Sequence, residues 1–162
     1  MKKSLAVVAC MAALVVLVTV QSTAEQGKLE GVWKAIETTT AGNPVKITVP
    51  PDRPGLLIFT KKYTGFWNIA ALTRPGYPRQ GATDAQKVAA WEPFQAVAGT
   101  YEVKGNIITR RIIVAKDPNN MPPGNWQTIE FKIEGDTLIT TQKTTEIGPF
   151  PNPITMKYVR LE

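Results

Sequence analysis

The sequence predicts an all-β domain of eight short antiparallel strands, arranged as an up-and-down barrel or a sandwich. Three observations predict this fold class. Runs rich in β-branched and aromatic residues recur along the chain after its first two dozen residues. Two pairs of these runs are separated by Gly105-Asn106 and Gly135-Asp136, dipeptides that favour tight hairpin turns. One segment interrupts the β pattern with strong helical signals.

The expected strands cover residues 29–39, 56–60, 63–71, 100–104, 107–115, 126–134, 137–144 and 154–161. Successive side chains of a strand point to opposite faces of the sheet. This alternation groups the following residues by face: Trp33, Ala35, Glu37 and Thr39 in the first strand; Gln127, Ile129, Phe131 and Ile133, pointing inward, in the sixth; and Met156, Tyr158 and Arg160 in the last.

A short helix is expected between the third and fourth strands. Thr83 and Gln86 have the spacing of a capping box, and residues 85–90 favour helix. Pro93 is expected to end or kink this helix, or to begin a second short turn over residues 94–98 that Gly99 would stop. The aromatic residues nearby are expected to pack the helix across one opening of the fold.

The N-terminal 24 residues resemble a secretory signal peptide in their layout. Lys2 and Lys3 precede an apolar run over residues 5–20, and small residues follow at 22–24. We expect cleavage after Ala24, one domain over residues 25–162, a monomer, and a periplasmic or extracellular protein without stable membrane insertion. A retained membrane anchor, or a lipoprotein cut at Cys10, are the alternatives.

The composition excludes several classes of function. The chain has no His, and its single Cys, Cys10, leaves with the expected signal peptide. Disulfides, thiol chemistry and His-based catalysis are therefore excluded from the mature domain. The formal charge of +6, or +4 without Lys2 and Lys3, is scattered along the sequence, which disfavours nucleic-acid binding. No cofactor and no metal site are expected.

The fifth expected strand contains Arg110 and Arg111, and one of them must share a face with two or three aliphatic side chains. An outward arginine would extend its stem over apolar surface and keep its charge in water. An inward arginine needs a protein carboxylate or an anionic ligand as a partner. In that arrangement Arg110 would hold a carboxylate head group inside an otherwise apolar cavity.

Templates for nucleophilic, phosphate-binding and metal-dependent enzymes are missing from the sequence, which leaves open whether the protein is an enzyme. A cyclase or isomerase could use an internal carboxylate, for which Glu37 and Glu102 are the candidates. A third hypothesis is a protein-interaction or inhibitor module that acts through long Pro-rich loops. These loops are expected at residues 40–54, 73–82, 118–125 and 145–153.

An ordered set of short motifs resembles the bacterial and fungal lipocalin-like domain family, whose fold is a calycin-type β-barrel. The resemblance covers roughly residues 29–161. Its motifs are Gly31-x-Trp33, Gly65-Phe66-Trp67, Arg74-Pro75, the segment FQAVAGTYEV at residues 94–103, Gly135-Asp136-Thr137-Leu138 and Tyr158-Val159-Arg160. It implies an eight-stranded antiparallel up-and-down barrel with one short helix between strands three and four. It also implies an internal cavity, and hence a small apolar or amphipathic ligand.

The resemblance also implies roles for single residues. Gly31 would let the chain turn tightly into the first strand, Trp33 would plug the closed end, and Arg160 would lie across Trp33 and bind nearby carbonyls. The residues expected to contact a ligand are Arg110, Arg111, Trp67, Tyr101, Phe131 and Tyr158.

Overall fold

The computed structural model describes residues 26–49, 55–69 and 74–162, with the side chains of 43–47 excepted. The expected signal peptide lies outside the described residues. The ten strands are β1 (Gly31–Thr40), β2 (Asn43–Thr48), β3 (Leu56–Phe59), β4 (Tyr63–Ile69), β5 (Phe94–Lys104), β6 (Ile107–Ala115), β7 (Trp126–Glu134), β8 (Thr137–Thr145), β9 (Gly148–Pro149) and β10 (Ile154–Arg160). The helical segments of the described residues are one turn at residues 26–29, α2 (Asp84–Trp91) and the short 3-10 turn η1 (Pro118–Asn120).

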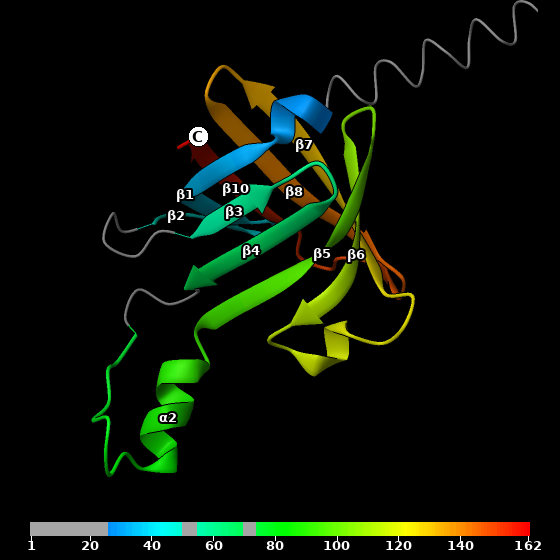
Figure 1. Ribbon diagram of the computed structural model, residues 1–162. Coiled ribbons are helices and arrows are strands. Elements are labelled where there is room, and N and C mark those ends of the chain that lie inside the picture. The colour runs from blue at the N-terminus through cyan, green and yellow to red at the C-terminus, as the bar shows by residue number, and fades with distance from the viewer. Residues whose placement is uncertain (1–25, 50–54, 70–73) are drawn as a thin grey trace, which may run out of the picture.

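Eight of these strands form the closed antiparallel barrel that the sequence predicts. Neighbours pair in the order β10-β1-β3-β4-β5-β6-β7-β8, and β10 also pairs with β8, which closes the barrel (Figure 1). The two strands that the sequence did not predict lie off this ring, with β2 on β1 and β9 on β8. Both contain a proline, a residue that weakens a strand prediction because it lacks the amide hydrogen.

The two ends of the barrel differ because their connections differ in length. At one end β3–β4, β5–β6 and β7–β8 are joined by tight turns, and Gly105 and Gly135 have the positive φ angles, 59° and 58°, that such turns require. At the other end lie the long connections between β1 and β3, β4 and β5, β6 and β7, and β8 and β10. The described parts of the long predicted loops therefore lie at the same end of the barrel.

Trp33 fills the barrel at the end with the tight turns. Its side chain is fully buried, and its indole Nε1 donates to the Leu29 carbonyl at 2.8 Å. The Arg160 guanidinium lies 4.0 Å from the Trp33 ring centroid and donates to the carbonyls of Lys28 and Glu30. Gly31 has φ 131°, and a Cβ there would clash with the Glu162 carbonyl. Trp33 therefore has the position and the contacts expected of a plug.

The helix begins where the sequence predicts but is shorter than one alternative allowed. Thr83 and Gln86 form the capping box, with hydrogen bonds of 3.0 and 3.3 Å between them. The helix ends at Trp91, and Phe94 already begins β5. The alternative prediction of a second helical turn over residues 94–98 is therefore wrong, because these residues pair with β4. Gly99 does not stop a helix, and its missing Cβ instead lets β5 approach the Arg111 carbonyl of β6.

The position of α2 also corrects an expectation. The helix projects away from the barrel beyond β4 and β5, and within it only Ala90 is buried (Figure 1). The helix therefore does not cover the barrel opening, and the expectation that it would is wrong. Lys116 attaches the end of the helix to the barrel, since its Nζ donates to the carbonyls of Trp91 and Glu92 at 2.8 and 2.9 Å.

Replacing Trp33 with alanine should lower the free energy of unfolding by about 3–5 kcal/mol, because the change empties the closed end of the barrel. Urea unfolding followed by circular dichroism measures the loss. Trp67→Ala is the matched control, since the Trp67 side chain is 40% exposed and its removal should cost much less. A loss below about 1 kcal/mol for Trp33→Ala would show that Trp33 is not the plug.

Candidate functional site

The barrel encloses a cavity of about 730 Å³ between the Trp33 plug and the end with the long loops. All eight barrel strands contribute to its wall. The apolar part of the wall includes Leu57, Phe59, Phe66, Ile108, Ile129 and Met156. A cavity of this volume, mostly apolar with a few polar groups, is typical of sites for small organic molecules.

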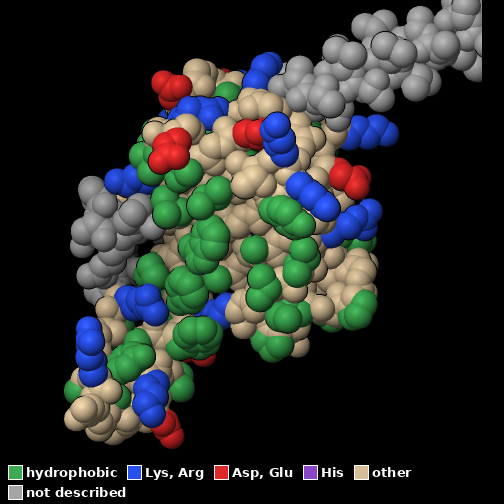
Figure 2. Space-filling model, viewed as in Figure 1, with side chains coloured by type: hydrophobic (Ala, Val, Ile, Leu, Met, Phe, Trp, Pro, Cys, Tyr) green, Lys and Arg blue, Asp and Glu red, His purple; other side chains and the backbone are tan. Residues whose placement is uncertain are grey.

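The cavity reaches the surface at the end of the barrel with the long loops. Its wall there includes Trp91 and Glu92 at the end of α2, and Asp117 and Pro118 after β6, all of which are exposed. Figure 2 shows apolar side chains gathered on the face of the barrel and the helix that is turned to the viewer. A molecule could therefore enter from this rim without disturbing the plug.

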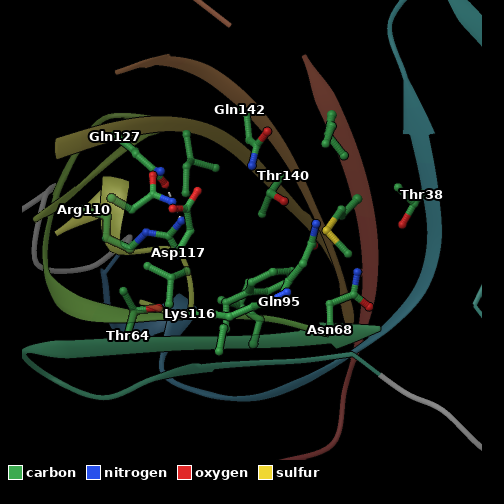
Figure 3. A pocket seen from close by; sticks show the side chains of 18 of the residues that line it. Thr38, Thr64, Asn68, Gln95, Arg110, Lys116, Asp117, Gln127, Thr140 and Gln142 are labelled. Atoms are coloured by element: carbon green, nitrogen blue, oxygen red, sulfur yellow. Dashed lines mark hydrogen bonds between the residues drawn. The ribbon is translucent and has the colours of Figure 1, made fainter. Parts of the chain in front are cut away.

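Arg110 points into the cavity rather than into solvent. It is 5% exposed, and its Nη2 donates to Gln127 Oε1 at 2.5 Å (Figure 3). The two residues are directly paired across β6 and β7, so the strand register places them together. Arg111, the next residue, is exposed. The structure thus settles the face of the fifth predicted strand, with Ile108 and Arg110 inward.

The charge of Arg110 is not balanced by a carboxylate of the described residues. Among the described residues, no carboxylate forms an ion pair with it. Burial lowers the pKa of Arg110 to about 10, so the side chain is still a cation at neutral pH. A buried cation without a counter-charge is unfavourable for folding.

Tyr158 and Thr140 add hydroxyl groups to the wall near Arg110. Burial raises the pKa of Tyr158 above its ordinary value, and a hydrogen bond with Thr140 and the charge of Arg110 oppose this only in part. The phenol is therefore neutral at physiological pH and remains a hydrogen-bond donor. In the structure it donates to Met156 Sδ at 3.2 Å, and a thioether is a weak acceptor.

Three buried polar side-chain atoms in the described part of the chain have no hydrogen-bond partner: Thr64 Oγ1, Asn68 Oδ1 and Arg110 Nε. All three residues line the cavity. Figure 3 shows Thr64 on the same side as Arg110 and Asn68 farther along the cavity. Buried polar groups in folded proteins are usually satisfied, so these three atoms are the positions of the cavity wall at which a bound molecule can form hydrogen bonds.

The other residues expected to contact a ligand lie outside the cavity wall. The Trp67 indole is on the outer face, over Gly65. Tyr101 is buried, packs edge-on against Phe59 and donates to the Thr60 carbonyl at 2.7 Å. Phe131 belongs to the core below the cavity. Of the six expected residues, the structure brings together Arg110 and Tyr158.

The two glutamates proposed for catalysis do not line the cavity either. A bulge between Ala35 and Glu37 changes the alternation of β1, so that Thr38 and Thr40 face the cavity in place of Glu37 and Thr39. The predicted shared face of the first strand is therefore wrong beyond Ala35. Glu102 is exposed on β5, beside Lys62 and Arg111 at a small hollow on the outer surface.

Several lining residues were not singled out in the sequence. Gln127 was expected to point inward, as it does, but nothing in the pattern marked it as the partner of Arg110. Thr64, Asn68 and Thr140 also line the cavity. Polar residues at inward positions of otherwise apolar strands are the signal that could have identified them.

Comparison with known families agrees with this architecture. The model of the lipocalin-like domain family matches residues 30–152, which is most of the chain. The chain belongs to this family. The matched stretch contains the Trp33 plug and the cavity residues of β1 to β8, while β10, with Tyr158 and Arg160, follows it. No curated protein and no solved structure matches the chain.

Residues 26–49, 55–69 and 74–162 contain no group of three or more acidic, His or Cys side chains that could hold a metal ion. No helix in the described part of the lipocalin-like domain is long and apolar enough to cross a membrane.

Replacing Arg110 with methionine and Gln127 with leucine should leave the free energy of unfolding unchanged or raise it by about 1–4 kcal/mol, because the change removes a buried charge that has no counter-charge among the described residues. Urea unfolding of the ligand-free protein at pH 7 measures the effect. Arg111→Met is the control, since its exposed side chain should change stability by no more than about 0.5 kcal/mol. A loss above about 2 kcal/mol in the double variant would contradict the unbalanced charge.

Proposed function

We propose that this lipocalin-like protein is an exported binding protein that holds one small amphipathic molecule inside its barrel. The observation that carries the proposal is the cavity itself, with its apolar wall and three unpaired buried polar atoms. An apolar wall favours binding through burial of the ligand's apolar surface. The unpaired polar atoms favour a ligand that also carries a polar group.

Family membership supports the same proposal at the level of the fold, since the lipocalin-like barrel is a fold that can surround a small ligand. Fold alone does not determine function, and the cavity of this chain is what supports a binding role. Its wall combines apolar side chains, such as Leu57 and Phe66, with polar side chains, such as Thr64, Arg110 and Gln127. An amphipathic molecule matches this combination.

The cavity should bind a neutral apolar probe, N-phenyl-1-naphthylamine, with saturable one-to-one stoichiometry and an increase in its fluorescence. Ile129→Trp or Val97→Trp should abolish this binding, because each introduces a large side chain into the cavity from a different strand, and Val97 is paired with the cavity-lining Phe66. Ile147→Trp is the matched control, since Ile147 is 91% exposed and this variant should bind as the original protein does.

Circular dichroism confirms that the two filled variants fold before their binding is compared. Probe binding that persists in both of them with unchanged affinity would contradict a ligand site inside the barrel.

The N-terminal sequence supports export, since a positive start and an apolar run precede small residues at 22–24. Protein recovered from the periplasm or the medium of its host should begin at Glu25, as N-terminal sequencing would measure. A chain that keeps Met1 in the membrane fraction would indicate a retained anchor. A chain that begins at Cys10 would indicate a lipoprotein.

A further inference from the structure

We infer that the ligand of the barrel is a molecule with a single carboxylate head, which Arg110 binds within the cavity while the apolar body extends toward the rim. This inference rests on the proposed function and adds to it the charge and the orientation of the ligand. It starts from one side chain, because Arg110 is a cavity-lining residue with a full charge and no protein counter-charge among the described residues.

Arg110 has unused N–H donors with which it can bind a ligand. A guanidinium has five N–H donors, and Nη2 of Arg110 uses one of them on Gln127. Arg110 Nε is buried and has no partner. A carboxylate can take two parallel hydrogen bonds from a guanidinium, which gives orientation as well as affinity. Gln127 holds the guanidinium in place for this contact.

The number of charges favours a carboxylate over a doubly charged group such as a phosphate. Among the described lining residues the second cation is Lys116, whose Nζ already donates to the carbonyls of Trp91 and Glu92. Arg110 therefore offers one positive charge within the cavity, which one carboxylate neutralises. A phosphate dianion would leave a negative charge buried, which is strongly unfavourable.

The distribution of charge along the cavity sets the orientation. The lining carboxylates of the described residues, Glu92 and Asp117, are exposed at the rim. They would repel an anionic head that stayed there, whereas Arg110 attracts it inward. The Tyr158 hydroxyl, which donates to the weak acceptor Met156 Sδ, lies on the wall of the same cavity. The apolar body of the ligand then lies against Phe66 and Phe94.

The test compares dodecanoate with dodecanol, two probes that share the same chain and differ in the head group. Ligand-free protein is titrated with each at pH 8 by displacement of N-phenyl-1-naphthylamine. Dodecanoate should bind about 10- to 100-fold more tightly than dodecanol, as expected for hydrogen bonds between charged groups. Arg110→Met should remove this preference and leave the affinity for dodecanol unchanged.

Two further variants separate charge from geometry and from position. Arg110→Lys keeps the charge but not the planar fork, so it should keep only part of the preference. Arg111→Met removes the neighbouring charge on the outer face and should keep all of it.

Equal binding of dodecanoate and dodecanol by the original protein would overturn the inference while leaving the proposed function intact. Retention of the preference in Arg110→Met, or its loss in Arg111→Met, would also overturn it. Tighter binding of dodecyl phosphate than of dodecanoate would overturn the assignment of a single charge. If none of the probes binds, including the neutral N-phenyl-1-naphthylamine, the proposed function itself fails.

Discussion

The contact between Arg160 and Trp33 closes one end of the barrel, and the cavity depends on it. Trp33 lies in the first barrel strand and Arg160 in the last, so the contact joins the two ends of the domain across the seam where β1 meets β10. The guanidinium also binds the carbonyls of Lys28 and Glu30, which precede β1. Because the Trp33 plug closes this end, the cavity can be open at the other end without exposing the core to water at both ends.

The cavity beyond the Trp33 plug contains polar groups that are unfavourable for the stability of the barrel on its own. Arg110 is a buried cation with no carboxylate partner in the part of the chain that the structure describes, and unpaired polar atoms of Thr64 and Asn68 share its cavity. Apolar side chains at these inward positions would be expected to give a more stable domain. Groups that are unfavourable for folding alone are commonly found at binding sites, where a ligand supplies the missing partner. The unpaired polar groups of the cavity therefore fit the proposed binding function.

Local signals in the sequence predicted much of the fold, because they act over a few residues. The Gly-Asn and Gly-Asp turns, the Thr83 capping box and the inward face of β7 were all found in this way. The β1 bulge, which moves Glu37 off the cavity wall, has no such signal. The sequence could not decide which of Arg110 and Arg111 points inward, because apolar residues occur on both faces of β6. Ile113 alternates with Arg111 and Val114 with Arg110, and both of these apolar residues are exposed. Residues 94–98 favour helix locally, but pairing with β4 makes them a strand.

A crystal structure of the protein with dodecanoate tests the central claim most directly, because it locates the head group. We predict the chain inside the barrel, with a carboxylate oxygen at hydrogen-bonding distance from Arg110 Nε and Gln127 still on the other side of the guanidinium. A carboxylate at the rim beside Lys116, with the chain pointing inward toward Trp33, would contradict the account. So would an empty barrel with dodecanoate on the outer surface.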